Sequence, residues 1–113
     1  MAVYFKTKDP RELLATFKKK IDDKRVVTWS YDKDGDFTHE VPQWKNLAWL
    51  RPRIKEGELA LFIVCPKQSK ITTETYAIYH GRFIESMLGH CDALFKQGIA
   101  SAMAEGEDKV ASD

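Results

Sequence analysis

The most regular alternation of apolar and polar positions in the chain lies between residues 83 and 95. Its apolar residues are separated by steps of one, three and four, and the polar residues between them fall on the other side. This spacing matches the 3.6-residue period of an amphipathic helix. The predicted buried stripe consists of Phe83, Ile84, Met87, Leu88, Cys91, Leu94 and Phe95.

Residues 72–79, directly before this helix, have the composition of a strand. The run TTETYAIY is rich in β-branched and aromatic side chains, which are enriched in strands. We therefore expect a strand over 72–79 that turns at His80-Gly81 straight into the C-terminal helix.

A second helix is predicted from residue 10 to about residue 24. Asp9 is a suitable N-cap, Pro10 suits the first helical position, and Glu12 follows the cap at the spacing of a capping box. The apolar residues expected to be buried are Leu13, Leu14, Phe17 and Ile21.

Further strands are predicted over residues 2–6, 26–31, 36–41 and 58–65. A turn at 32–35, which contains Asp34-Gly35, joins the second and third of these into a hairpin. Residues 42–57 fit a short helix or turn at 43–47 and then an extended piece, which Pro52 would confine to a sheet edge. In the hairpin, one face is expected to hold Val27, Trp29 and Tyr31, and one face of the partner strand Phe37, His39 and Val41.

Both helical stripes need an apolar surface to cover, and a single sheet face can supply it. The expected fold is therefore α+β, a two-layer sandwich with a mostly antiparallel sheet of about five strands and two helices packed on one face. The element order is β-α-β-β-(β)-β-β-α. Residues 1–104 form one globular domain in this interpretation, and residues 105–113 form a disordered acidic tail.

Charge and cysteine usage narrow the class of protein. The formal net charge is +1, but residues 105–113 hold four acidic residues and one lysine, so residues 1–104 carry +4. That is short of the positive field of most duplex-DNA binders. Cys65 and Cys91 lie in apolar runs without a CxxC pattern, which favours free thiols in a reducing compartment, although a disulfide between them is compatible with the sequence. With no apolar run long enough to span a membrane, we expect a cytoplasmic protein.

One candidate binding segment interleaves tryptophans with cations. Aromatic faces beside guanidinium and ammonium groups bind single-stranded nucleic acid, and tryptophans also anchor protein interfaces. The alternative is that both tryptophans cover the core while the cations extend outward. The candidate residues are Trp44, Lys45, Trp49, Arg51 and Arg53, with Lys55 following and Trp29 and Tyr31 expected nearby.

A candidate catalytic site lies at the expected strand-to-helix turn. There His80 would stand near backbone N–H groups, Arg82 would supply a fork for phosphate or carboxylate, and Glu85 would orient His80 or act as a base. A purely structural role is the alternative, with Gly81 allowing the turn and Glu85 complementing the helix dipole. The histidines and cysteines lack zinc-site spacing, so neither a metal nor a cofactor is expected.

These observations lead to two functional hypotheses. The first is a small cytoplasmic binding module without catalytic activity, whose partner is a protein or a single-stranded nucleic acid. The second is a small enzyme that performs hydrolysis or group transfer in a His80–Arg82–Glu85 pocket. The sequence specifies neither the substrate or partner nor the oligomeric state.

Overall fold

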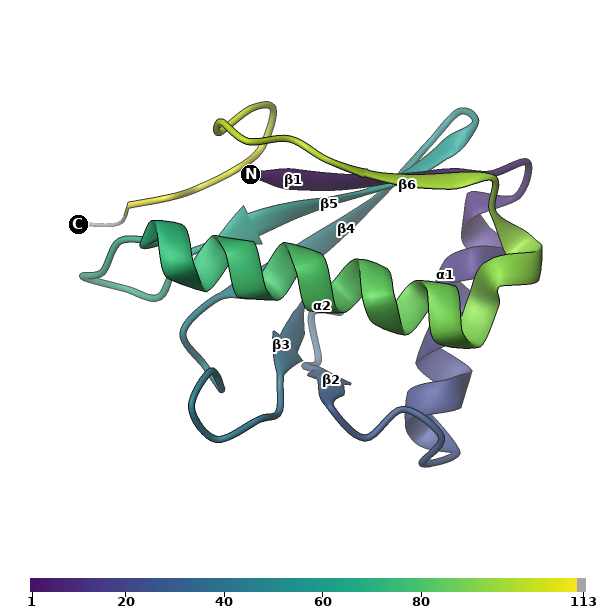
Figure 1. Cartoon of the computed structure of the whole chain (residues 1–113), viewed down its shortest axis with the longest axis horizontal. Coiled ribbons are helices and arrows are strands. Elements are labelled where there is room, and N and C mark those ends of the chain that lie inside the picture. The colour runs from purple at the N-terminus through teal and green to yellow at the C-terminus, as the bar shows by residue number, and fades with distance from the viewer. Residues whose placement is uncertain (112–113) are drawn as a thin grey trace.

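One antiparallel sheet organises the chain. The structure is a computed structural model that describes residues 1–111, and within them six strands pair in the order β2-β3-β4-β5-β1-β6 (Figure 1). Each neighbouring pair is antiparallel. The strands are β1 (Ala2–Lys6), β2 (Trp29–Tyr31), β3 (Phe37–His39), β4 (Trp49–Lys55), β5 (Glu58–Val64) and β6 (Gln97–Ala100).

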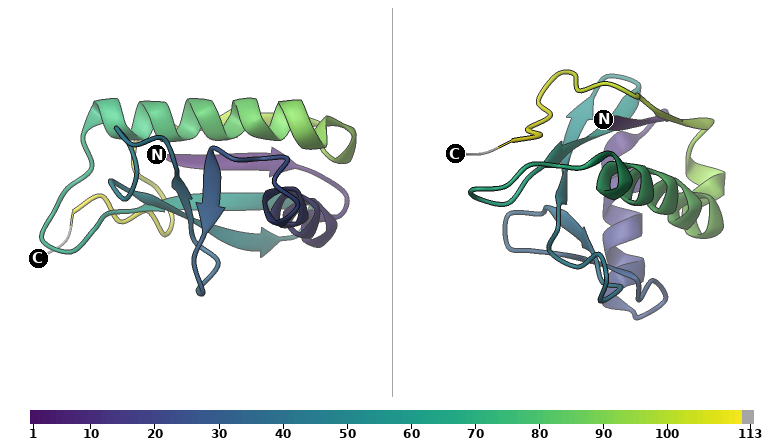
Figure 2. Two further views of the ribbon diagram at one scale, coloured as in Figure 1. Left: turned by 90° about the horizontal axis from the view of Figure 1, so that it is seen from below. Right: turned by 60° about the vertical axis from the view of Figure 1, so that its left-hand side comes forward.

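Two helices cover one face of this sheet, which confirms the predicted α+β two-layer sandwich. They are α1 (Pro10–Asp22) and α2 (Thr73–Cys91), and the short 3₁₀ helix η1 (Asp92–Leu94) follows α2. Figure 2 shows α2 as a layer of its own that runs along the strands. The predicted start of α1 is confirmed, since Asp9 accepts a hydrogen bond from the Glu12 backbone N–H and Pro10 occupies the first turn.

The core lies between the helices and this sheet face. Phe17 of α1, Phe37 of β3 and Phe83 of α2 pack their rings together at centroid separations of 5.1–5.7 Å. Burial of such large apolar side chains is the main favourable term in folding. Of the predicted α2 stripe, Phe83 and Met87 are fully buried. The prediction was wrong for Leu88, whose side chain is 53% exposed.

The predicted strand over residues 72–79 is instead the first two turns of α2. Thr72 is the N-cap, and its hydroxyl accepts a hydrogen bond from the Thr75 N–H. Tyr79 and Thr75 are buried one and two turns before Phe83, respectively, so the helical period extends back to the cap. The turn expected at His80-Gly81 is therefore absent, and both residues lie inside the helix.

The chain after α2 also differs from the expectation. Residues 97–100 form β6, an edge strand beside β1. Residues 105–111, the described part of the tail that we expect to be disordered, run beside β5 and contact it. The Asp108 carboxylate accepts a hydrogen bond from the Ile63 N–H, and the Lys109 carbonyl accepts one from the Cys65 N–H. Residues 112–113, the end of the predicted tail, lie outside the described part of the chain.

The hairpin predicted from Asp34-Gly35 is present but shorter than expected. β2 and β3 pair Trp29 with His39 and Tyr31 with Phe37. Val27 precedes β2 and is 69% exposed, so it does not share the buried face as predicted. A short helix or a turn was predicted at residues 43–47, followed by an extended piece. The structure has a turn there, and β4 follows it.

Candidate functional site

The structure separates the residues of the predicted tryptophan–cation segment. These residues are Trp44, Lys45, Trp49, Arg51 and Arg53. Trp44 lies in the turn before β4 and is only 7% exposed, and its carbonyl accepts a hydrogen bond from the Tyr79 hydroxyl. Trp49 is half-buried at the first position of β4. Trp44 thus packs in the core, and the two rings do not form a shared exposed platform.

Arg51 is held by a buried carboxylate on the neighbouring strand end. Its guanidinium contacts Asp36 at two points, with Nε 3.1 Å from Oδ1 and Nη2 2.8 Å from Oδ2. This two-point geometry is the strong form of an arginine–carboxylate pair. The hydrogen bond to Asp36 raises the pKa of Arg51 above its ordinary value. Arg51 therefore ties β4 to the end of the hairpin turn.

The other two cations of the segment are paired as well. Nζ of Lys45 lies 3.2 Å from a carboxylate oxygen of Glu40. Nε of Arg53 donates to Glu107 at 2.8 Å. A phosphate would have to displace a carboxylate at each of these positions. Lys55, which follows the candidate residues, has no carboxylate partner among residues 1–111, and its Nζ lies over the Phe62 ring. One such lysine is fewer than the free cations that a nucleic-acid surface requires.

The three residues of the predicted catalytic pocket do not converge. His80 is buried in the middle of α2, and its Nδ1 lies 2.6 Å from the Tyr76 carbonyl oxygen. Arg82, two residues on, is rotated by about 200° around the helix and reaches β3 instead. Glu85 is exposed about one turn after Arg82, near enough to His39 for its charge to act on the pKa of that histidine. The arrangement cannot hold one substrate among all three side chains.

Arg82 belongs to a cluster around His39 that the sequence analysis did not assemble. Nε2 of His39 lies 3.1 Å from Nη1 of Arg82, and Nδ1 lies 2.7 Å from the Thr28 carbonyl oxygen. The imidazole stacks on Trp29 with ring centroids 4.5 Å apart. Burial lowers the pKa of His39. The only signal for this cluster was the predicted placement of Trp29 and His39 on their strand faces.

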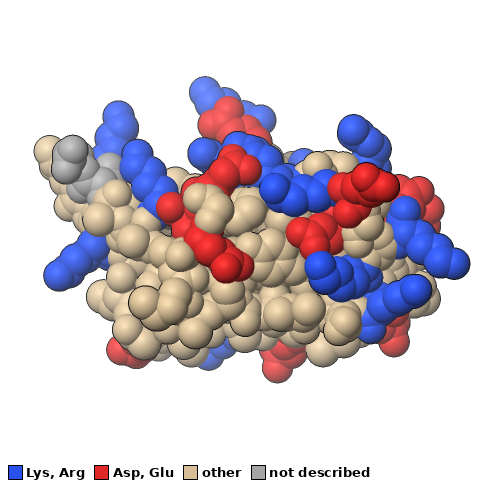
Figure 3. Space-filling view, turned by 90° about the horizontal axis from the view of Figure 1, so that it is seen from above, with Lys and Arg blue, Asp and Glu red and all other residues tan. Residues whose placement is uncertain are grey.

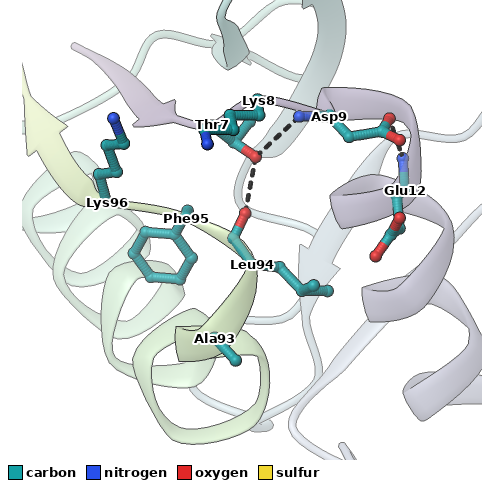
Figure 4. Close-up of a pocket in the computed structure, with 8 residues that line it drawn as sticks. All are labelled: Thr7, Lys8, Asp9, Glu12, Ala93, Leu94, Phe95 and Lys96. Atoms are coloured by element: carbon teal, nitrogen blue, oxygen red, sulfur yellow. Dashed lines mark hydrogen bonds between the residues drawn. The ribbon is translucent and has the colours of Figure 1, made fainter.

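A hollow of about 350 Å³ lies where the loop after β1 meets the connection from η1 to β6 (Figure 4). Its central polar groups hold the backbone together. The Thr7 hydroxyl donates to the Leu94 carbonyl at 2.6 Å, and Asp9 caps α1. Lys8 and Lys96 line the rim and are exposed. Two chain segments therefore meet at this hollow, but no nucleophile and base lie together in it.

The outer edge of β6 is a sheet edge without a neighbouring strand among residues 1–111. Within this described part of the chain, strand β6 ends the sheet and pairs only with β1. The Ser101 N–H donates to the Ala2 carbonyl, and the register pairs Ile99 with Tyr4. Since hydrogen-bonded pairs alternate along an antiparallel ladder, the backbone groups of Ile99 point to β1. Those of the intervening residues, Gly98 and Ala100, point away from the sheet.

Apolar side chains lie beside this edge on both faces of the sheet. Ile99 is 41% exposed on the face it shares with Tyr4. On the helix side, a Cβ at Gly98 would lie 3.6 Å from Ile84. Leu88 follows Ile84 by one turn on the same side of α2 and is exposed. We call the outer backbone of residues 97–101, together with Leu88 and Ile99, the β6 edge.

The surroundings of the β6 edge carry few charges. Figure 3 views the molecule from the side of β1 and β6 and shows a broad area without Lys, Arg, Asp or Glu, while charged side chains gather elsewhere in the same view. In the sequence, residues 97–104 (QGIASAMA) include no charged residue. Exposed edge strands are usually protected by charges, proline or a bulge. The β6 edge has no charge or proline.

Residues 1–111 contain neither a metal-binding cluster nor a membrane-spanning helix. No group of three or more His, Cys, Asp or Glu side chains in that part is placed to hold a metal ion. None of its helices is both long enough and apolar enough to cross a bilayer. Cys65 and Cys91 are free and buried, and burial raises the pKa of the Cys91 thiol. A buried thiol of raised pKa is a poor nucleophile.

Comparison with known proteins adds no assignment. No protein-family model, no curated protein and no solved structure matches this chain.

Proposed function

We propose that this protein is a small non-catalytic binding module whose partner is a protein that adds a strand to the β6 edge. The observation that carries the proposal is the row of outward backbone groups at Gly98 and Ala100, on an edge without a protecting charge. Strand addition supplies partners for such groups, and it derives its affinity from main-chain hydrogen bonds. The exposed Ile99 and Leu88 would supply apolar contacts on the two faces of the added strand.

The opposite edge of the sheet supports the choice of β6 by contrast. Strand β2 has only three residues, and Asp32, Lys33 and Asp34 follow it directly. Short length and flanking charge are the usual means of protecting an edge. Strand β6 is also short, with four residues, and Lys96 precedes it. The contrast lies in the chain after the strand, where no charged residue follows β6 before Glu105.

The alternatives have less support from the geometry. A single-stranded nucleic acid would need exposed aromatic faces and free cations, whereas Trp44 is buried and Lys45, Arg51 and Arg53 are each paired with a carboxylate. The enzymatic alternative needs His80, Arg82 and Glu85 in one pocket, and these side chains diverge.

A cytoplasmic location is part of the proposal. Cys65 and Cys91 are separate free thiols, and free thiols persist in reducing compartments. This observation supports the cytoplasm without identifying the partner.

Proline at position 100 gives a direct test. The Ala100 N–H points away from β1, so Ala100→Pro removes an outward donor without removing a bond of the β1–β6 ladder, as edge prolines do. Ala100→Ser is the matched control, because it keeps that N–H. Circular dichroism and the urea midpoint would establish that both variants are folded.

The measurement is amine cross-linking in cells that express the protein, with adducts at Lys96, the exposed lysine directly before β6, identified by mass spectrometry. We expect the wild type and Ala100→Ser to form the same adducts and Ala100→Pro to lose them. Adducts that persist unchanged in folded Ala100→Pro would contradict the proposal, and so would the absence of any adduct in the wild type.

A further inference from the structure

We infer that the strand added to the β6 edge is β6 of a second copy of this chain, antiparallel to the first about a two-fold axis at Ile99. The inference rests on the proposed function, since it names the occupant of the same edge. It would join the two sheets into one continuous sheet, with the α2 helices on the same side.

The backbone geometry favours this register. The outward residues of each copy are Gly98 and Ala100, so a two-fold axis at Ile99 places Gly98 of one copy opposite Ala100 of the other, and the reverse. Both positions then exchange hydrogen bonds in closely spaced pairs. A register centred on Gly98 would use Lys96, whose N–H already donates to the Lys6 carbonyl. The axis at Ile99 leaves that bond intact.

The side chains of the strand are also compatible with self-pairing. The two Ile99 residues would face each other in the pair that is not hydrogen-bonded, where side chains are closest. Each is 41% exposed in the single chain, so pairing removes apolar surface from water. Because residues 97–104 carry no charge, no like charges oppose each other along the joined strands.

Charges of both signs lie near the ends of β6. Lys8 and Lys96 stand with Asp9 and Glu12 around the hollow before the strand. Glu105, after the strand, is exposed and accepts a hydrogen bond from the Tyr4 hydroxyl at 2.5 Å. No block of like charge at either end therefore opposes the pairing of two β6 strands.

Leu88 is the exposed apolar residue on the helix side of the proposed contact between the two β6 strands. It was predicted to be buried from its helical period, yet it is 53% exposed in the single chain. It lies on the side of α2 that faces β6, one turn beyond Ile84. On this side the second copy's β6 would present Gly98 and Ala100, which share the helix face with Phe5 and Val3, so the departure from the predicted stripe falls where the second copy is placed.

The test is the mass of the protein in solution, measured by light scattering and sedimentation velocity. The wild type is expected at twice the 13.0 kDa of one chain. Ile99→Lys and Ile99→Asp each place like charges at the two-fold axis, so each variant alone should run at 13.0 kDa. An equimolar mixture of the two should recover the doubled mass, because opposite charges then meet.

Val27→Lys and Val27→Asp are the controls, since Val27 is exposed outside the β6 edge and these variants should keep the doubled mass. A wild type that is monomeric at every concentration would contradict the inference that the added strand comes from a second copy. A dimer that persists in both Ile99 variants would overturn the β6 contact, and variants that stay monomeric when mixed would overturn the register at Ile99.

These outcomes are distinct from failure of the proposed function. A monomeric wild type that still forms adducts lost in Ala100→Pro would overturn the second copy and support another protein as partner. A monomeric wild type without such adducts would overturn both.

Discussion

Nη1 of Arg82 lies 3.1 Å from Nε2 of His39, so that α2 and β3 share a hydrogen bond across 43 positions of the chain. Arginine stays protonated and can only donate. Nε2 of His39 therefore accepts, and Nδ1–H donates to the Thr28 carbonyl. The folded state holds His39 as the neutral imidazole, with both of its nitrogens used.

Because the Arg82–His39 hydrogen bond requires a neutral imidazole, we predict that the free energy of unfolding falls in mild acid. Burial, and to a lesser degree the charge of Arg82, lower the pKa of His39 below its ordinary value. In the pH range between the folded pKa and about 6.5, the unfolded chain binds a proton that the folded chain does not. The contribution of His39 to the free energy of unfolding is thus present above about pH 6.5 and is lost as pH falls through the folded pKa.

His39→Gln should reduce this dependence, as measured by urea unfolding at about pH 7.5 and about pH 5. Burial also lowers the pKa of His80, so part of the acid sensitivity should remain in His39→Gln and disappear in the double variant with His80→Gln. If wild type and double variant lost the same free energy on acidification, the neutral buried imidazoles would not be its source.

Arg51 and Arg53 lie two residues apart on β4 and should differ in their effect on stability. Arg51→Met leaves the Asp36 carboxylate, whose side chain is 7% exposed, without its partner, and should cost about 1–3 kcal/mol. Arg53→Met frees Glu107, which is half-exposed, and should cost about 0–1 kcal/mol. Urea midpoints would compare the two, and equal losses would contradict the role assigned to the Asp36 pair.

Gly106 tests the packing of residues 105–111 on the sheet. Its φ is +58°, and a Cβ there would lie 2.6 Å from the Phe62 ring. Gly57 has a similar φ of +75° but open space around it. Gly57→Ala should cost about 1 kcal/mol from backbone strain alone, and Gly106→Ala should cost about 1–3 kcal/mol more from the ring contact. A Gly106→Ala variant no less stable than Gly57→Ala would mean that this segment does not rest on Phe62.

The start of α2 can be tested with two neighbouring threonines. Thr72→Ala removes the N-cap hydrogen bond to the Thr75 N–H and should lower the free energy of unfolding by about 1 kcal/mol. Thr73→Ala lies at the first helical position and is exposed, so it should be neutral or slightly stabilising, because alanine is the better helix former. If residues 72–79 were a strand, the two substitutions would have no reason to differ in this direction.

The strand predicted over residues 72–79 was wrong because the prediction followed the amino-acid composition of the segment rather than its helical period. Threonines and tyrosines over 72–79 favour a strand by propensity. However, Thr75 and Tyr79 continue the buried row of Phe83 and Met87 at intervals of four. The period extended over the whole helix and was readable in the sequence, and tertiary packing decides in its favour.

Strand β6 had no such signal. Only Ile99 among its four residues favours a strand, and the strand forms because β1 offers a free edge and Gly98 fits against Phe5. Likewise, the order of residues 105–111 depends on Asp108 and the Ile63 N–H, 45 positions apart. Pairings of that range are not encoded in local patterns.

The candidate site was predictable to a smaller extent than the fold. The α+β sandwich, the capped helix α1 and the hairpin follow from period and turn chemistry. The tryptophan–cation segment was visible as a pattern, but the carboxylates that pair with it are Asp36 and Glu40, on either side of β3, and Glu107. The open edge could not be predicted, because it depends on the strand order.

Amide hydrogen exchange of β6 as a function of protein concentration tests the pairing of two β6 edges most directly. The Ile99 N–H points to β1 and should exchange slowly at every concentration, which makes it the internal reference. The N–H groups of Gly98 and Ala100 should exchange slowly in concentrated protein and rapidly after dilution, as the second copy leaves. Rapid exchange of both at every concentration, with Ile99 protected throughout, would contradict the pairing.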